Sequence, residues 1–452
     1  MNNPNKNYDS LKLNPSHFLI LWFGITILTG ATLLNLPFAS IDGNSIGFID
    51  ALFTSASAVC VTGLIVVNTA AHWTLFGKIV ILILIQIGGL GIMTMATLIA
   101  FLLGRRITLK DRLLIREELN ATTLQGIVLL TKRVLFMTIG IEAIGAVFLS
   151  FSFTKEMGMI KGIWYSIFHA VSAFCNAGFD ITGNSLVDYT DDIIVNITVM
   201  LLIVLGGIGF YVFMEVLRER RFRYFSLHTK LVLITTTILI IFGAILVLVM
   251  EYNNPATLGV LNVKDKIMAS FFQSVTPRTA GFNTIDTAGL KYSTSFLIII
   301  LMFIGGSPGS TAGGIKTTTT GIIIISTYRL VMGYEDIEFF KKRIDLKTVI
   351  RALSVVTIAT FVVAVVTIIL SITEINSGFT FHDVFFEVIS AFGTVGLSRG
   401  LTPNLSNIGR IIITFTMFIG RIGPLTIAFA IAQGQDKNKG NYRFPIGKIL
   451  VG

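Results

Sequence analysis

The chain alternates long apolar runs with shorter polar stretches from one end to the other. The runs occupy residues 17–38, 79–103, 193–216, 231–250, 296–305, 352–371 and 411–433. Several reach the roughly 20 residues that a helix needs to cross about 30 Å of hydrocarbon. The first run lacks a small-residue cleavage site of the signal-peptide type, so we expect it to remain as a membrane span. The pattern predicts an all-α membrane protein.

Composition and charge agree with this prediction. Of the 452 residues, 53% are hydrophobic and 13% are charged, whereas a soluble domain carries about 25% charge, so a soluble or secreted protein is excluded. The formal net charge of +10 comes largely from the stretches 104–133, 218–230, 329–351 and beyond 434. The positive-inside rule makes these stretches and both termini cytoplasmic. Topology and contact with membrane lipid headgroups account for the charge, so no nucleic-acid partner is predicted.

A short motif recurs four times along the chain. In each copy a Phe precedes a Gly by ten positions and a bulky apolar residue follows the Gly; the pairs are Phe53/Gly63, Phe168/Gly178, Phe271/Gly281 and Phe386/Gly396. We align the four copies without gaps. Three copies also carry a Ser six positions before the Gly, whereas the third has Val275 there and Ser274 one position earlier. Four matches at nearly constant spacing indicate an internal repeat.

The topology gives these motifs a location. Each unit leaves the cytoplasm through one span and returns through another, so its motif lies between them on the outer side. Non-helical backbone at membrane depth must be buried in protein or line a watery cavity. A helix that ends at the motif directs its negative dipole end toward the membrane centre, and carbonyl groups before the Gly can replace water around a cation. A single glycine fits a turn or a close helix contact equally well, but the four together predict a pore.

The strings around the four motifs are specific. They read VTGL (61–64) and IQIGGLG (85–91) in unit one, FHAVSAFCNAGF (168–179), LGGIGF (205–210) and FSLHTKL (225–231) in and after unit two, TPRTAGFN (276–283) and FIGGSPGSTAGGIK (303–316) in unit three, and SAFGTVGLS (390–398) and MFIGRIGPLT (417–426) in unit four. They extend over nearly the whole chain. The chain thereby resembles the Ktr/Trk/HKT superfamily of potassium transporters, most closely the membrane subunits of Ktr systems.

The resemblance implies four pseudo-symmetric M1–P–M2 repeats, with eight transmembrane helices and four re-entrant pore loops around one ion pathway. The repeats would occupy residues 14–104, 127–218, 228–330 and 347–434, and the tail 435–452 would lie at a dimer interface. Each repeat would supply one strand of a selectivity filter that binds K⁺ through backbone carbonyls. The predicted filter residues are Val59, Cys60, Val61, Thr62, Gly63, Phe174, Cys175, Asn176, Ala177, Gly178, Pro277, Arg278, Thr279, Ala280, Gly281, Phe392, Gly393, Thr394, Val395 and Gly396.

Residues 305–314 interrupt the second span of unit three. Small residues and a Pro at this density cannot hold a continuous helix. The resemblance implies an intramembrane loop below the filter that gates it; a kink without a gating role is the alternative. The predicted gate residues are Gly305, Gly306, Ser307, Pro308, Gly309, Ser310, Thr311, Ala312, Gly313 and Gly314, with Lys316 at the cytoplasmic mouth and Arg421 in the conduction path.

Other ionisable residues lie within or near the predicted spans. Arg421 lies about ten residues from either end of its span, where a charge is costly, so we expect it to face a cavity or a partner rather than to snorkel. Glu142, in the first span of unit two, fits an interhelical contact or ion binding. Asp50 and Asp383 each precede their filter glycine by thirteen positions, which suits the N-cap of a pore helix or the attraction of cations. Arg278 is expected to point away from the pore and brace its segment.

These features predict the K⁺-conducting subunit of an uptake system in the bacterial plasma membrane, with inward flux along the electrochemical gradient. The resemblance further implies a homodimer, a cytosolic ring of RCK-type subunits that binds ATP or ADP, and Na⁺ as an activator, although no residue identifies a Na⁺ site. A K⁺/Na⁺ or K⁺/H⁺ symporter is the alternative, supported by Glu142 alone. The chain carries no HExxH or Walker A string and only two cysteines, so neither an enzyme nor a metal cluster is predicted.

Overall fold

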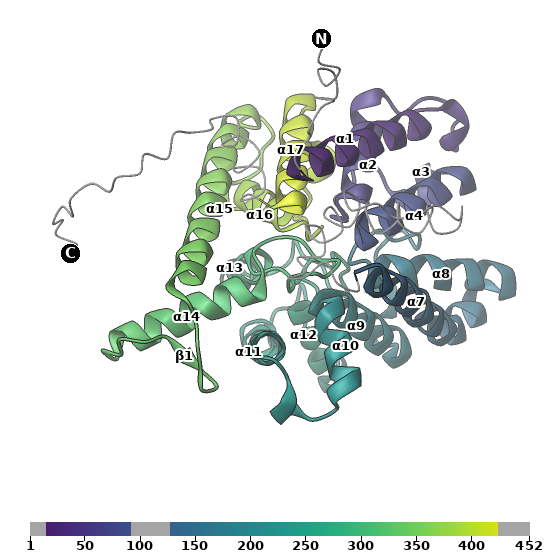
Figure 1. Cartoon of the computed structure of the whole chain (residues 1–452). Coiled ribbons are helices and arrows are strands. Elements are labelled where there is room, and N and C mark those ends of the chain that lie inside the picture. The colour runs from purple at the N-terminus through teal and green to yellow at the C-terminus, as the bar shows by residue number, and fades with distance from the viewer. Residues whose placement is uncertain (1–14, 92–126, 424–452) are drawn as a thin grey trace, which may run out of the picture.

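The computed structural model describes residues 15–91 and 127–423 (Figure 1). The tail 435–452, most of the basic stretch 104–133, and the ends of the first and fourth predicted repeats lie outside the described residues. Within these described ranges the regular structure is helical apart from one hairpin, in which β1 (Glu338–Phe339) pairs antiparallel with β2 (Lys342–Arg343). The prediction of an all-α protein is confirmed.

Groups of helices follow one another in the order that the repeat predicts. Each group has a first helix, a short helix that ends at a glycine motif, and a second helix. The first helices are α1 (Pro15–Leu34), α7 (Ile127–Met157), α11 (Leu227–Glu251) and α15 (Leu346–Thr373). The short helices are α2 (Phe48–Val59), α8 (Met159–Phe174), α12 (Val263–Val275) and α16 (Phe381–Gly393). The second helices are α4 (Leu75–Leu90), α9 (Ile193–Ile208), α13 (Tyr292–Phe303) and α17 (Asn407–Ile422).

Further helices extend or connect these groups. α10 (Phe210–Glu219) follows α9 and α14 (Thr317–Val331) follows α13 across the 305–314 loop. The connections contain α3 (Thr69–His72) and the 3₁₀ turns η1 (Pro37–Ala39), η2 (Val187–Tyr189), η3 (Phe222–Tyr224) and η4 (Thr402–Asn404).

The groups lie around a common centre in chain order (Figure 1). Neighbouring groups meet where α4 contacts α8, α9 contacts α12 and α13 contacts α16. α17 contacts α2, so the fourth group closes the ring against the first. The short helices thereby bring their C-terminal ends to the middle of the molecule.

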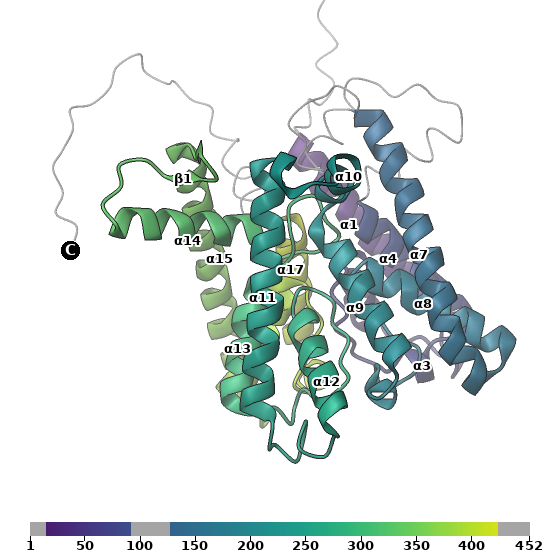
Figure 2. The same cartoon turned by 90° about the horizontal axis from the view of Figure 1, so that it is seen from below.

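Several described helices have the length and apolar character of membrane spans. Residues 131–157 of α7, together with α11 and α15, each meet both requirements, and α9 with α10 meets them as one span bent by 98°. Residues 19–34 of α1, together with α4 and α13, form shorter apolar helices. Figure 2 shows α7 and α11 from the side, with the short helices α8 and α12 next to them.

Carboxylates at the ends of two first helices position the second helices that follow. Glu251 at the end of α11 accepts a hydrogen bond from the N–H of Lys291 (3.0 Å), the N-cap residue of α13. Glu374, just after α15, accepts from the N–H (3.1 Å) and the hydroxyl (2.5 Å) of Ser406, the N-cap residue of α17. A negative charge at a helix N-terminus is favourable because of the helix dipole. In units three and four these contacts join the C-terminal end of the first helix to the N-terminal end of the second helix.

Unit three departs from the gap-free alignment. Phe53, Phe168 and Phe386 are fully buried, as expected for one repeated position. Phe271, their counterpart in that alignment, is 39% exposed, and Phe272 is buried instead. The alignment over α12 is therefore wrong by one residue.

A pair of serines supports the same correction. Ser55 of α2 donates a hydrogen bond to the carbonyl of Ile27 in α1 (2.7 Å), and Ser274 of α12 donates to the carbonyl of Ile240 in α11 (2.8 Å). Ser55 lies eight residues before its glycine, but Ser274 lies seven before Gly281. Unit three therefore has one residue fewer between this serine and its glycine.

Candidate functional site

The four glycine segments, residues 59–63, 174–178, 277–281 and 392–396, share one unusual backbone. In each, both the glycine and the residue two positions before it have a positive φ. The values are 56° at Val61, 59° at Asn176, 72° at Thr279 and 51° at Thr394, and 87°, 68°, 77° and 91° at Gly63, Gly178, Gly281 and Gly396. A left-handed conformation costs a residue with a Cβ about 1–2 kcal/mol. Its recurrence in four different sequences indicates that a common backbone shape is required there.

The glycines of these segments meet in a closed ring. A Cβ atom built on Gly63 would lie 2.5 Å from the carbonyl oxygen of Ala177, one on Gly178 would lie 2.7 Å from that of Ala280, one on Gly281 would lie 2.5 Å from that of Val395, and one on Gly396 would collide with that of Thr62. In every case the oxygen belongs to the residue directly before the next glycine. Backbone carbonyls therefore gather at the centre, where no side chain fits.

Hydroxyl groups hold each segment to its own short helix. Ser57 accepts a hydrogen bond from the N–H of Gly63 and Ser390 accepts one from the N–H of Gly396, both at 3.1 Å. In unit two, Ser172 donates to the carbonyl of Phe179 (2.7 Å). These are the serines that the repeat singles out.

In unit three the hydroxyl comes from a residue that the gap-free alignment missed. Thr276 donates to the carbonyl of Phe282 (2.5 Å), as Ser172 does to Phe179. The N–H of Ala280 also donates to the carbonyl of Thr276 (2.9 Å), four residues earlier, whereas the other units bridge five. In the sequence, the hydroxyl-free Val275 followed directly by Thr276 was the signal of this shift.

The opposite end of each segment packs on a second helix. The carbonyls of Val59, Phe174 and Phe392 face Gly88, Gly206 and Gly420, where any Cβ would collide with them. Unit three differs because Gly305 packs against Gly313 of its own loop. The glycine-rich strings therefore allow a second helix to pack closely against a glycine segment.

Two of the predicted polar residues contact neighbouring helices. The buried guanidinium of Arg278 donates to the hydroxyl of Thr236 on α11 (3.2 Å), directed away from the ring. The carboxylate of Glu142 accepts from the side-chain amide of Gln86 on α4 (3.1 Å). The interhelical contact expected for Glu142 is present, next to the buried thiol of Cys175 (3.8 Å).

The 305–314 loop separates α13 from α14 and lies against unit two. The N–H of Ser307 donates to Gly207 O (2.9 Å), that of Thr311 to Gly206 O (3.2 Å), and that of Phe210 to Gly309 O (2.9 Å). The hydroxyl of Thr311 also donates to Phe174 O (3.2 Å), so the loop contacts a glycine segment directly.

The same loop packs beneath unit four. A Cβ on Gly314 would lie 3.3 Å from the Cα of Gly393, and one on Gly313 would collide with the side chain of Thr394. Isolated pairing between Ile304 and Ile315 brings the two ends of the loop together. The predicted interruption of this span is present, and it reaches the segments of units two and four.

Two cations fix the loop from below. Lys316, the N-cap residue of α14, donates from Nζ to the carbonyl of Ala312 (2.7 Å). Arg421 donates to the carbonyls of Thr311 in the loop and Gly88 in α4. Arg421 lies in the last turn of α17, which ends at Ile422; residues 424–433 of the predicted span lie outside the described residues. A cation in the last turn of a helix is favoured by the negative end of the helix dipole.

Breaks in the other second helices were not predicted. α4, α9 and α17 end at Gly91, Gly209 and Gly423, with φ of 87°, 100° and 94°. Each lies three residues after the glycine that packs on a segment. At Gly209 the chain turns by 98° into α10. The repeated GxxG spacing was the signal for these breaks.

Asp50 and Asp383 lie in the first turns of their short helices but are not N-caps. Gly47 caps α2, and Thr380 caps α16 with Asp383 completing a capping box. Asp383 also pairs with Arg399 (2.7 Å), and Asp50 pairs with Arg410 (2.5 Å) of α17. The second pair joins unit four to unit one and helps to close the ring.

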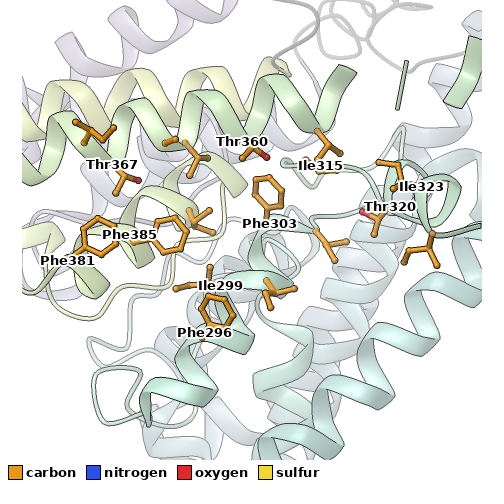
Figure 3. Close-up of a pocket in the computed structure, with 18 residues that line it drawn as sticks. Phe296, Ile299, Phe303, Ile315, Thr320, Ile323, Thr360, Thr367, Phe381 and Phe385 are labelled. Atoms are coloured by element: carbon orange, nitrogen blue, oxygen red, sulfur yellow. The ribbon is translucent and has the colours of Figure 1, made fainter. Parts of the chain in front are cut away.

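An apolar groove of about 610 Å³ borders the loop on its outer side (Figure 3). Its walls come from α13, α14, α15 and α16, and Ile304 and Ile315 at the ends of the loop line it. Phe303 in this groove also stacks on Phe392 of the fourth glycine segment, with ring centroids 6.2 Å apart.

Comparison with known proteins accounts for this architecture. The model of the TrkH family, described as cation transport proteins, matches residues 7–441. The chain belongs to the TrkH family. It is 44% identical to Ktr system potassium uptake protein B of Bacillus subtilis and 43% identical to potassium/sodium uptake protein NtpJ of Enterococcus hirae, covering 98% of each chain in both comparisons.

A solved structure agrees with this TrkH-family membership. The crystal structure of the potassium transporter TrkH from Vibrio parahaemolyticus superposes with a TM-score of 0.72 at 19% identity, covering 94% of this chain and 86% of that chain. At this identity the similarity shows the fold. The resemblance inferred from the sequence strings is confirmed.

Proposed function

We propose that this chain conducts K⁺ inward across the plasma membrane through the ring of glycine segments, as the ion-conducting subunit of a Ktr-type system. The ring itself carries the proposal, because carbonyl oxygens gather where the glycines leave no room for side chains. Carbonyl oxygens can replace the hydration shell of an alkali cation. The relatives are named as potassium and potassium/sodium uptake proteins, which supports the same cargo.

The 305–314 loop is the proposed gate. It lies against two of the four segments and is held by hydrogen bonds of about 0.5–1.5 kcal/mol each, or about 1.5–3 kcal/mol where a charge takes part. A regulatory partner can supply free energies of this size. Lys316 and Arg421 contact the loop, and their positive charges oppose a cation below the ring while the loop is in place.

Membership of the family supports a larger assembly. The name "Ktr system" of one relative implies further subunits. We propose a homodimer with both termini in the cytoplasm, the tail 435–452 at its interface, and a cytosolic RCK-type ring that binds ATP or ADP and acts on the loop. The transported ion is K⁺, with Na⁺ as an activator; the nucleotide acts only on the ring.

Reversal potentials in liposomes with imposed K⁺, Na⁺ and H⁺ gradients test the proposal. Passive conduction predicts a potential that follows the K⁺ gradient alone. Coupled symport is the rival, and buried Glu142 beside Cys175 is the observation that favours it. A potential that shifts with pH, and loses that shift in Glu142→Gln, would replace passive conduction with proton coupling.

A further inference from the structure

A groove of about 810 Å³ lies between the start of α7 and α10. Figure 2 shows α10 across the end of the molecule at which α7 begins, which is the end predicted to be cytoplasmic. The groove combines basic and apolar side chains, among them Lys132, Arg133, Phe136, Tyr211, Leu217 and Arg218. It is separate from the ring and the loop described above.

The groove is positive in character. Lys132 and Arg133 are exposed at the start of α7. The side chain of Arg218 on α10 is 79% exposed and pairs with that of the adjacent Glu219 (2.8 Å). The acidic side chain in the lining, Glu215, is occupied elsewhere: it accepts hydrogen bonds from the N–H and hydroxyl of Ser226 (2.7 Å each) at the start of α11. The negative charge of Glu215 thus lies at the N-terminus of α11. The three cations face the groove and its rim.

Large apolar side chains lie beside these cations. Phe136, Tyr211 and Leu217 are 69%, 54% and 59% exposed. Exposed rings and aliphatic side chains next to cations at a membrane boundary match a phospholipid, whose acyl chain takes the apolar part and whose phosphate takes the basic part. A soluble phosphate would leave the apolar part uncovered. We propose that the α7–α10 groove binds an anionic phospholipid of the cytoplasmic leaflet.

α10 connects this groove to the loop. Its first residue, Phe210, donates its N–H to Gly309 O (2.9 Å), while Glu215 fixes the same helix to α11 through Ser226. A methyl group on Gly209 would lie 2.6 Å from Pro308 O. A lipid that holds α10 therefore holds the loop, so the site regulates flux; this second step rests on the proposed function, whereas binding does not.

Binding is tested first, without flux. The purified protein is titrated with soluble short-chain phosphatidylglycerol, and its thermal unfolding is followed; phosphatidylcholine and glycerol phosphate serve as probes for the neutral headgroup and the free phosphate. Only phosphatidylglycerol should stabilise the protein. In Lys132→Gln/Arg133→Gln/Arg218→Gln the affinity should fall roughly 100-fold, since a basic residue near an anionic surface contributes about 1 kcal/mol.

A charge-matched control separates a site from general attraction. Lys155→Gln/Lys161→Gln/Lys264→Gln removes three exposed lysines that lie away from the groove, two near the far end of α7 and one in α12, and should keep full affinity. Equal losses in both triple variants, or stabilisation by glycerol phosphate, would overturn the lipid site. A groove triple variant that binds lipid normally but no longer responds to the cytosolic ring would identify a protein-docking surface instead.

Coupling is tested in liposomes of phosphatidylcholine with and without phosphatidylglycerol. Flux of the unmodified protein should change severalfold with phosphatidylglycerol, and Phe210→Pro should bind the lipid but lose that change. Proline is tolerated at the first position of a helix and removes the N–H that reaches Gly309; Phe210→Leu keeps this N–H and is the matched control. Loss of the change in both variants would overturn the route through Phe210. Absence of K⁺ flux in every lipid would contradict the proposed function and leave the binding result intact.

Discussion

The ring of glycine segments and the 305–314 loop lie against each other but are built in opposite ways. All four units contribute to the ring through the same backbone conformation, with different side chains. The loop comes from unit three alone and is fixed by backbone hydrogen bonds to unit two and by Arg421 of unit four, which also donates to Gly88 of unit one. Symmetry is thus kept where the backbone alone makes the site, and it is abandoned in the loop that we propose as the gate.

The largest expected effect comes from adding a side chain to the ring. Gly396→Ser should abolish K⁺-dependent growth of a host that lacks other K⁺ uptake, because its Cβ would collide with Thr62 O. Gly400→Ser is the matched control: Gly400 has φ of 95° but open space around it. Both variants then bear the strain of a positive φ, about 1–2 kcal/mol, and they differ only in the steric crowding around the new side chain.

Equal loss in the two variants would mean that backbone strain, and not the ring, explains the defect. Gly281→Ser should behave as Gly396→Ser does, because a Cβ on Gly281 also faces a carbonyl oxygen, that of Val395. A difference between them in K⁺ over Na⁺ preference would show that the units of the ring are not equivalent.

Deleting residues 307–313 should have the next largest effect, in the opposite direction. Tracer K⁺ uptake into liposomes should rise about tenfold, since that ratio corresponds to only 1.4 kcal/mol and several hydrogen bonds hold the loop. The pairing of Ile304 with Ile315 brings the ends of the excised segment together. Unchanged uptake by a protein that remains folded and dimeric would show that the loop does not limit flux.

Arg421 allows a finer test of the same asymmetry. Arg421→Gln removes a guanidinium that donates to both Thr311 and Gly88, so uptake should rise severalfold, less than in the deletion. Arg421→Lys keeps the charge but cannot form both hydrogen bonds. Uptake in the lysine variant equal to wild type would assign the effect to charge, and uptake equal to the glutamine variant would assign it to the hydrogen bonds.

The sequence predicted the symmetric part of the molecule better than the asymmetric part. Glycine spacing predicted the four segments and where the short helices end, because a backbone position too crowded for a side chain requires glycine, which is visible in the sequence. The one-residue shift in α12 was not predicted, since Phe271 and Phe272 are adjacent and only burial distinguishes them. The sequence did not predict that Arg421 lies in the last turn of α17, because hydropathy does not reveal that this helix ends at Ile422.

The sequence also did not predict the partners of the charged residues. Asp50 meets Arg410 and Asp383 meets Arg399, the first pair across a long separation in the chain. No local pattern identifies such partners, because they depend on how the first and fourth units close the ring. Glu215 and Ser226, in contrast, lie on either side of a short turn, and the Ser of the FSLHTKL string is a recognisable N-cap.

A moderate loss of stability should test the register of unit three. Thr276→Val removes the hydroxyl that holds Phe282 O and should lower the free energy of unfolding by about 1–2 kcal/mol. Thr276→Ser should restore it. Val275→Ala removes no hydrogen bond, so it should not show this loss of free energy of unfolding. Thermal unfolding in the presence of K⁺ measures all three variants. If Val275→Thr recovered the stability lost in Thr276→Val, position 275 would be the one that carries the hydroxyl, and the gap-free alignment would be correct.

The smallest effect concerns Asp383 at the outer end of α16, and it depends on pH. Burial disfavours the charge, but hydrogen bonds from Thr380 and Arg399 and the Arg399 charge outweigh burial and lower the pKa of the Asp383 carboxyl below its ordinary value. A depressed pKa stabilises the fold above the ordinary value of 3.8, and this contribution is lost as pH falls through the folded-state value.

The Asp383 and Arg399 side chains are only 14% and 11% exposed. Asp383→Asn keeps an acceptor for Arg399 but loses the charge, so it should cost about 1 kcal/mol at neutral pH, the net size of one hydrogen bond, and progressively less as the solution is made acidic. Asp42→Asn, at an exposed position, is the control and should leave the acid limb of the stability curve unchanged. Arg399 also donates to the carbonyls of Thr287 and Leu290 in unit three, so Arg399→Gln should cost more than Asp383→Asn. If the two variants cost the same at every pH, the ion pair alone joins these units, and the carbonyl contacts add nothing.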